Sequence, residues 1–242
     1  MILILTSSPC LEGDYHLNPA NGFIEMLFRT VKAGARVLFV SAAPDDEGFS
    51  DYCAESMFHS LKSSGLELSR FISLDRRTAN QSVKLIARSD FIVMEGGHVP
   101  TQNKFIRELG LRERIRGFDG VVMGISAGSM NCADIVYSQP EEPGESVDPE
   151  YRRFLPGLGL TKTNILPHYQ KVCNNILDGR RLYEDITFED SIGHTFYVFP
   201  DGSYLVQENG HETIYGDCWR IKDGKMQKIC SKNRCFKFQH GI

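Results

Sequence analysis

The chain has 242 residues and a formal net charge of −4, with 41% hydrophobic and 24% charged residues. This composition is typical of a soluble globular protein, and the length favours one domain spanning residues 1–242. The negative charge argues against nucleic acid or an anionic membrane as the main partner, because both bind basic surfaces.

Seven cysteines are scattered along the chain without a Cys-x-x-Cys pair. This pattern favours free thiols over a disulfide framework or a zinc site, and it predicts a reducing compartment. The apolar start is too short for a secretory signal, and no apolar run reaches the length of about 18 residues that a membrane span requires. We therefore expect a cytoplasmic protein.

In the first half of the chain, short apolar runs alternate with longer amphipathic stretches. We expect strands at residues 2–5, 36–40, 90–94 and 120–125, and helices at 22–32, 48–64 and 101–116. Strands separated by helices of this length predict an α/β fold in which helices flank both faces of a parallel sheet.

The second half has a different pattern. Residues 139–159 predict an irregular loop, 163–166 a strand and 170–189 a helix. Strands are then expected at 195–199, 203–207, 212–215 and 218–221. They predict a small antiparallel C-terminal meander, with Asp201-Gly202 and Asn209-Gly210 as hairpin turns.

The most informative motif is Gly124-Ile125-Ser126-Ala127-Gly128, which follows the predicted strand 120–125. A helical segment is expected at 129–135. A serine in a sharp turn between a buried strand and a helix matches a nucleophile elbow, which presents the hydroxyl group at the carboxyl edge of the sheet. The other interpretation is a tight turn with Ser126 or Ser129 as a helix cap.

A serine nucleophile requires a base and an orienting acid. Position favours His98 and His168 as the base because each follows a predicted strand, whereas His16, His59, His194, His211 and His240 lie in less informative places. Asp201, Glu189, Asp190 and Asp217 compete as the acid. Gly97 and Ala127 could supply two backbone N–H groups to an oxyanion hole, although Gly97 could equally serve only a chain reversal.

The chain resembles the peptidase E (aspartyl dipeptidase) family of serine peptidases, which includes the cyanophycinases. The resemblance rests on four segments: Met94-Glu95-Gly96-Gly97, Gly124-Ile125-Ser126-Ala127-Gly128, Leu166-Pro167-His168 and Phe199-Pro200-Asp201-Gly202. It implies a fold like that of class I glutamine amidotransferases. It also implies that Ser126 is the nucleophile, His168 the base, Asp201 the acid, and Gly97 and Ala127 the oxyanion donors.

The resemblance is incomplete where the substrate would bind. His98 stands where the aspartyl dipeptidases usually have asparagine, and Arg180 and Arg181 align only loosely with their substrate-binding arginine. These three residues are candidate substrate-binding residues. They leave the preference for an N-terminal acidic residue open.

The sequence thus predicts a serine exopeptidase that acts on short peptides through an acyl-enzyme, without a metal or organic cofactor. The expected partner is a small peptide substrate, and a homodimer is one assembly that the sequence leaves open. The alternatives are a serine amidase or esterase of other specificity, and a catalytically silent binding protein on the same fold.

Overall fold

The computed structural model describes residues 1–238, so His240 lies outside the described part of the chain. The strands are β1 (Ile2–Thr6), β2 (Ala35–Val40), β3 (Leu68–Leu74), β4 (Phe91–Met94), β5 (Val121–Ile125), β6 (Ile135–Tyr137), β7 (Phe154–Pro156), β8 (Asn164–Leu166), β9 (Ile176–Leu177), β10 (Arg180–Arg181), β11 (Thr195–Val198), β12 (Tyr204–Glu208), β13 (His211–Tyr215), β14 (Cys218–Lys222), β15 (Lys225–Cys230) and β16 (Cys235–Lys237).

The helices are α1 (Phe23–Thr30), α2 (Glu47–Ser63), α3 (Ser82–Ala87), α4 (Val99–Glu108), α5 (Leu111–Ile115), α6 (Ala127–Met130), α7 (Tyr169–Val172) and α8 (Phe188–Asp190). Two short 3-10 helices, η1 (Ala20–Gly22) and η2 (Ala79–Gln81), and a π-helical turn, η3 (Leu182–Thr187), complete the set. Within residues 1–238, no helix combines the length and apolar character needed to cross a membrane.

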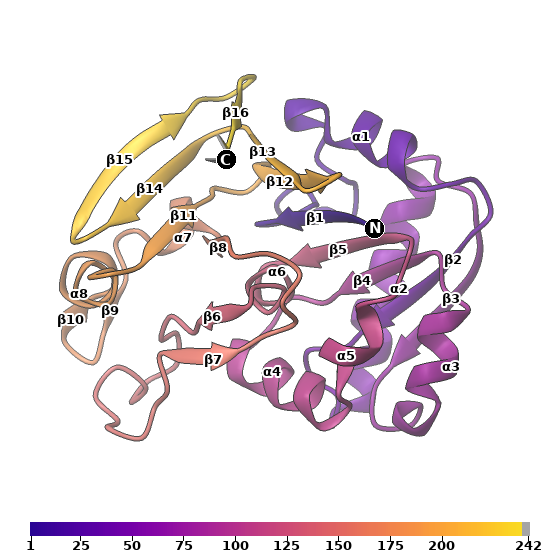
Figure 1. Ribbon diagram of the computed structural model, residues 1–242, viewed down its shortest axis with the longest axis horizontal. Helices are drawn as coiled ribbons and strands as arrows, with labels where there is room; N and C mark the ends of the chain where they lie inside the picture. Colours follow the sequence, from indigo (N-terminus) through magenta and orange to yellow (C-terminus); the bar gives the residue numbers. More distant parts are fainter. Residues whose placement is uncertain (239–242) are drawn as a thin grey trace.

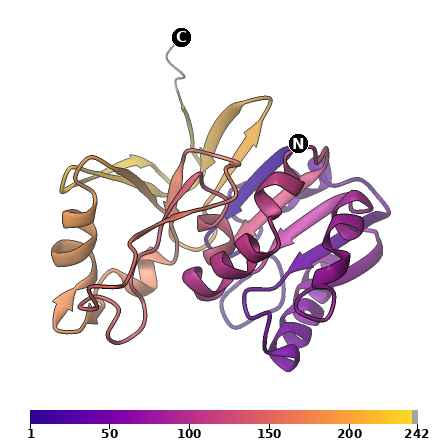
Figure 2. The ribbon, with the colours of Figure 1, turned by 60° about the horizontal axis from the view of Figure 1, so that its bottom comes forward.

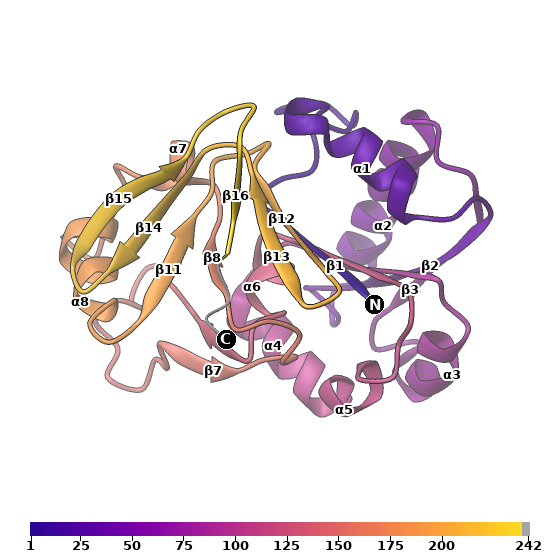
Figure 3. The same cartoon turned by 45° about the horizontal axis from the view of Figure 1, so that its top comes forward.

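The largest sheet has the strand order β16-β13-β12-β1-β5-β4-β2-β3. Strands β1 to β5 are mutually parallel, whereas β12, β13 and β16 continue the sheet in antiparallel pairs. A second sheet, β15-β14-β11-β8, lies beside it, and Figure 1 shows this sheet in the orange and yellow half of the molecule. Figures 2 and 3 show the same two halves side by side from other directions.

Helices cover both faces of the parallel strands, so β1, β2, β4 and β5 are almost entirely buried, whereas the edge strand β3 is largely accessible. Successive strand residues point to opposite faces of a sheet. Leu3 and Leu5 of β1 therefore pack with residues of α3, α4, α5 and α6, whereas Ile4 packs with residues of α1 and α2. This arrangement confirms the predicted fold class, a parallel sheet flanked by helices.

Two of the predicted helices are wrong in their extent. The segment 101–116 forms α4 and α5 instead of one helix, because Gly110 between them takes a φ of 58°. The helix after Ser126 has only four residues, and the chain is extended again from Ile135 in β6. Strand β6 pairs with β7, so the segment 139–159 is not wholly irregular.

The helix predicted at 170–189 is also wrong. After α7 the chain makes the hairpin β9–β10, whose turn residues Asp178 and Gly179 have φ values of 53° and 80°. Two consecutive positive φ angles fit a type I′ hairpin turn and cannot continue a right-handed helix. The apolar residues Leu182, Tyr183 and Ile186 belong instead to the π-helical turn η3.

The C-terminal strands do not form one meander. Asn209-Gly210 joins the antiparallel strands β12 and β13 as predicted. Asp201-Gly202 is not a hairpin turn, because β11 pairs with β14 and β8 in the second sheet, whereas β12 pairs with β1 in the first. Asp201 therefore lies where the chain passes from one sheet to the other.

Candidate active site

Ser126 occupies the sharp turn between β5 and α6, at the carboxyl edge of the parallel strands. Its backbone has φ 49° and ψ −115°, a conformation that residues other than glycine rarely adopt. Such strain costs about 1–3 kcal/mol and persists only where the surroundings impose it. Here the Ser126 N–H donates to the carbonyl oxygens of Thr6 and Ser7, each at 3.1 Å. The end of β1 thus helps to hold the turn.

Glycines on either side of Ser126 leave room for this turn. A Cβ atom at Gly124 would lie 2.5 Å from the Cα of Ser129, and one at Gly128 would lie 2.3 Å from the carbonyl oxygen of Met94. Both neighbours are backbone atoms that cannot rotate away. The Gly-x-Ser-x-Gly pattern is therefore required by close approach of the chain to itself.

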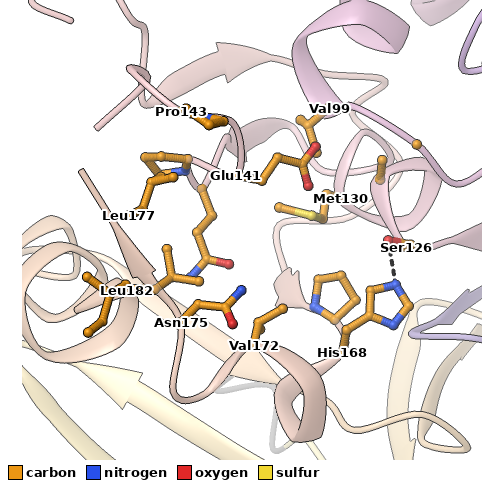
Figure 4. A pocket seen from close by; sticks show the side chains of 16 residues that line it. Val99, Ser126, Met130, Glu141, Pro143, His168, Val172, Asn175, Leu177 and Leu182 are labelled. Atoms are coloured by element: carbon orange, nitrogen blue, oxygen red, sulfur yellow. Dashed lines mark hydrogen bonds between the residues drawn. The ribbon is translucent and has the colours of Figure 1, made fainter. Parts of the chain in front are cut away.

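His168 follows β8 and brings its imidazole ring between a hydroxyl group and a carboxylate. Its Nε2 lies 2.9 Å from the Oγ of Ser126, and its Nδ1 lies 2.7 Å from the Oδ1 of Asp201. Figure 4 shows the ring directed at Ser126. The fold thus gathers three residues that lie far apart in the sequence into one hydrogen-bonded chain.

Asp201 is held by more than the imidazole. Ser7 Oγ donates to its Oδ1 at 2.6 Å, Gln170 Nε2 donates to its Oδ2 at 2.6 Å, and Lys171 Nζ lies 3.2 Å from Oδ2. Burial opposes ionisation of this carboxyl group. The hydrogen bonds from His168, Ser7 and Lys171, together with the Coulombic attraction of His168, outweigh burial and hold the pKa of Asp201 well below its usual range. Asp201 is therefore a fixed anion at neutral pH.

Other candidate bases and acids interact elsewhere. His98 lies at the start of α4, with Nδ1 2.8 Å from Thr101 Oγ1 and Nε2 2.8 Å from Glu145 Oε1. The other candidates also have partners away from Ser126. His16 contacts Asp14, His59 contacts Glu55, and the ring of His194 stacks on Phe154. Asp190 accepts a hydrogen bond from Tyr137, Glu189 pairs with Arg180, and Asp217 pairs with Lys228. Only His168 among these histidines is placed against Ser126.

Gly97 and Ala127 both line the cavity beside Ser126. A side chain at Gly97 would have its Cβ 2.8 Å from the Cβ of Ala42. Ala127 is the first residue of α6, so its N–H has no acceptor within the helix. The nearby Glu95 is buried, which raises its pKa, and it accepts a hydrogen bond from the Ala42 N–H at 2.6 Å. This hydrogen bond holds Ala42 in place next to Gly97 and so stabilises the glycine turn.

A cavity of about 230 Å³ opens beside Ser126 and His168. It is smaller than the roughly 300–1,000 Å³ of pockets for drug-sized ligands, so it suits a small substrate. Figure 4 shows Ser126 and His168 at one end, and Pro143 and Leu177 at the other. The lining residues are mostly apolar: Gly97, Val99, Ser126, Ala127, Met130, Gln139, Pro140, Glu141, Pro143, Pro167, His168, Val172, Asn175, Ile176, Leu177 and Leu182.

Glu141 brings a carboxylate into this mostly apolar cavity. Figure 4 shows its carboxyl group directed inward near Val99 and Met130. The residue is accessible to solvent, yet the atoms packed around its carboxyl group desolvate it and raise its pKa, against the attraction of His98 and His168. No lysine or arginine lines the cavity within residues 1–238. The site therefore offers an anion to a substrate.

Comparison with known proteins identifies the family. The family model for peptidase family S51 matches residues 3–215, most of the chain. The chain belongs to peptidase family S51. This membership assigns it to the serine peptidases and confirms the resemblance inferred from the sequence.

Two solved structures share the fold of this S51 peptidase. A peptidase from an acI-B1 Actinobacterium has a TM-score of 0.70 at 19% identity, over 98% of this chain and 96% of its own. A structure described as a peptidase E protein, from Listeria monocytogenes EGD-e, has a TM-score of 0.60 at 18% identity, over 95% of this chain and 98% of its own. No curated protein sequence gives a significant match.

The two arginines considered for substrate binding lie on β10 of the S51 peptidase, outside the cavity lining. Arg180 pairs with Glu189 at 2.8 Å, and Arg181 pairs with Asp185 at 2.5 Å. His98 is likewise absent from the lining, although Gly97 and Val99 on either side of it are present. Neither arginine therefore brings into the cavity the guanidinium group that an acidic substrate side chain would need.

One group of ligand-type side chains in the described residues is compact enough to share a metal ion. His98, Glu142 and Glu145 have ligand atoms within 4.8 Å of one another. However, Glu145 already accepts hydrogen bonds from His98 and from the N–H groups of Glu141 and Glu142. These hydrogen bonds anchor the loop that carries Glu141.

Four residues of the site were not predicted from the sequence. Ser7, Gln170 and Lys171 surround Asp201, and Glu141 enters the cavity. Ser7 follows the predicted strand 2–5, so its place at the carboxyl edge of the sheet was a usable signal. The other three lie in segments whose path the pattern did not reveal.

Proposed function

We propose that this S51 peptidase is an exopeptidase that hydrolyses short peptides with Ser126 as nucleophile, His168 as general base and Asp201 as orienting acid. The observation that carries the proposal is the hydrogen-bonded chain from Ser126 Oγ through the imidazole to Asp201, with distances of 2.9 Å and 2.7 Å. It opens onto a small cavity. A base within hydrogen-bond reach of a hydroxyl group can accept its proton as the hydroxyl attacks a carbonyl carbon.

The reaction is acyl transfer. Ser126 Oγ forms a bond to the peptide carbonyl carbon while His168 Nε2 takes the proton and then delivers it to the leaving amine. Water then attacks the carbonyl carbon of the acyl-enzyme while His168 takes its proton and delivers it to Ser126 Oγ, which releases the acid product. Asp201 keeps the Nδ1 proton in place and stabilises the imidazolium ion that forms. No step requires a metal or an organic cofactor.

The developing oxyanion needs hydrogen-bond donors. Gly97 and Ala127 line the cavity next to Ser126, and their backbone N–H groups are the proposed donors. A donor of this kind typically contributes about 2.7–4 kcal/mol to transition-state stabilisation. Backbone donors also need no side chain to be ordered, which suits a site built from glycine and alanine.

Glu141 is the proposed binding group for the N-terminal ammonium of the peptide. It places a carboxylate in a mostly apolar cavity whose lining, in the described part of the chain, contains no lysine or arginine to neutralise it, so it can pair with an ammonium group. The same carboxylate repels an acidic side chain. We therefore propose a peptide with a free N-terminus and an uncharged first side chain, in contact with the apolar lining, in place of an N-terminal acidic residue.

A panel of Xaa-Leu dipeptides, with and without an N-acetyl group, tests this assignment. For free-amine substrates we expect Glu141→Gln to raise KM roughly 10- to 100-fold with little change in kcat, because a ground-state contact is lost. This corresponds to about 1.4–2.7 kcal/mol. Since the pKa of Glu141 is raised, its carboxylate is protonated earlier as the pH is lowered. Wild-type kcat/KM should therefore begin to decrease on acidification at a higher pH than it would with a glutamate of ordinary pKa.

Glu142→Gln is the matched control, because Glu142 is the next residue of the same loop and does not line the cavity. It should leave KM unchanged. Equal effects of both substitutions, or equal loss on acetylated peptides, would contradict the role of Glu141. Turnover of simple esters with every dipeptide untouched would favour a serine esterase instead.

A further inference from the structure

Two chain segments meet over the end of the cavity that is remote from Ser126. One is the loop of residues 139–148, which supplies Glu141 and Pro143, and the other is the β9–β10 hairpin, which supplies Ile176 and Leu177. Figure 4 shows Pro143 and Leu177 together at this end. The contacts that join these two segments therefore determine whether the cavity ends at this point.

The join is made by Asp178, at the tip of the hairpin. Its Oδ1 accepts a hydrogen bond from the Gly144 N–H at 2.8 Å, and its Oδ2 accepts from the Ser146 N–H at 3.1 Å and from Ser146 Oγ at 2.7 Å. Ser146 Oγ also lies 3.5 Å from the carbonyl oxygen of Leu177. We call this set of contacts the Asp178 clasp.

The two partners of the clasp differ in how firmly they are held. The loop is fixed by Glu145, which contacts His98, and by Arg153, whose guanidinium donates to the carbonyl oxygens of Glu145 and Ser146 at 3.1 Å and 3.0 Å. The hairpin consists of two paired strands of two residues each, and Asp178 itself is exposed. Releasing the clasp should therefore move the hairpin and leave Glu141 in place.

We propose that the Asp178 clasp closes the cavity beyond the binding place of the first residue and thereby limits the acyl side of the substrate to one residue. The inference rests on the proposed function, in which Glu141 binds the N-terminal ammonium. A peptide with a further residue ahead of the scissile one would have to pass between Pro143 and Leu177. The clasp is thus a specificity-determining contact, and Asp178 touches no reacting atom.

The test compares Leu-p-nitroanilide with Ala-Leu-p-nitroanilide and Ala-Ala-Leu-p-nitroanilide. In Asp178→Ala we expect the ratio of kcat/KM for the longer substrates to that for Leu-p-nitroanilide to rise about tenfold or more, which is the range of discrimination by a small pocket. Ser146→Ala removes one of the three hydrogen bonds and should give a smaller rise. An unchanged ratio in Asp178→Ala, or an equal loss on all three substrates, would overturn the proposal.

Asp223→Ala is the matched control. Asp223 and Gly224 also form a hairpin turn, between β14 and β15, and Asp223 Oδ1 accepts a hydrogen bond from the Gly193 N–H at 2.9 Å, outside the cavity lining. It should leave the ratio at the wild-type value. Thermal unfolding of each variant shows whether a change in the ratio accompanies a loss of folded protein.

Failure of the proposed function would be visible in the wild-type protein as no release of p-nitroaniline from any substrate. In that event, the rates at which a short-chain and a long-chain fluorophosphonate modify Ser126 test the clasp alone. Asp178→Ala should then increase the rate for the long-chain reagent relative to the short-chain one. Equal relative rates in wild type and variant would overturn the clasp.

Discussion

Ser126→Ala should lower kcat for dipeptide hydrolysis by about 10⁴- to 10⁶-fold while the protein stays folded, because the attacking oxygen is lost and only binding and oxyanion contacts remain. The substitution leaves the backbone of the turn in place. Steady-state kinetics on the best dipeptide of the panel, with thermal unfolding of the same samples, measures both quantities.

Ser129→Ala separates chemistry from folding in the same turn. Ser129 Oγ is buried, accepts a hydrogen bond from the Thr6 N–H at 2.9 Å and donates to the Thr6 carbonyl oxygen at 2.8 Å. Its loss should lower the melting temperature more than Ser126→Ala does, because the buried Thr6 N–H is left without its hydrogen-bond acceptor. Substantial hydrolysis by Ser126→Ala would contradict the assignment of the nucleophile.

Asp201→Asn should lower kcat by about 10⁴-fold with KM nearly unchanged. The asparagine amide would donate a hydrogen bond to His168 Nδ1 and favour the tautomer with its proton on Nε2. That tautomer cannot accept the proton of Ser126. Asp217→Asn, which alters an acid paired with Lys228 away from the cavity, is the control and should keep wild-type kcat. Activity of Asp201→Asn within tenfold of wild type would exclude this acid.

The same substitution has a pH-dependent effect on stability. The pKa of Asp201 is lower in the folded protein than its unfolded value of about 3.9. Its ionised form therefore stabilises the fold above that pH, and the stabilisation is lost as the pH falls toward the folded pKa. Wild type should exceed Asp201→Asn in free energy of unfolding at pH 7, and this difference should shrink below about pH 4 in denaturant titrations.

Regular alternation of strand and helix made much of the first half of the fold predictable, although β3 and α3 were not among the expected elements. The buried strands and their helices follow from apolar periodicity, which tertiary contacts reinforce in a sheet covered on both faces. The segment 170–189 was not predictable in the same way. Its apolar residues have helical spacing, but Asp178 and Gly179 take positive φ and turn the chain back as a hairpin. Local turn chemistry decided the structure there.

The site was predictable in part, for a physical reason. Ser126 and His168 each follow a strand, so they were expected at the carboxyl edge, and the fold brings them within hydrogen-bond reach. The place of Asp201 depends on a crossing between two sheets that a Pro-Asp-Gly step does not encode. Glu141 lies in an acid-rich loop whose path depends on His98, Arg153 and Asp178.

The proposed mechanism requires His168 to activate Ser126, and a fluorophosphonate reports this activation because it modifies an activated serine hydroxyl group. Peptide mass spectrometry of the folded protein should find the adduct on Ser126, and His168→Ala should slow the modification by at least about 10³-fold, since the hydroxyl group then lacks its base. The mechanism would be excluded by an adduct on another serine, by the absence of any adduct, or by an equal rate in His168→Ala.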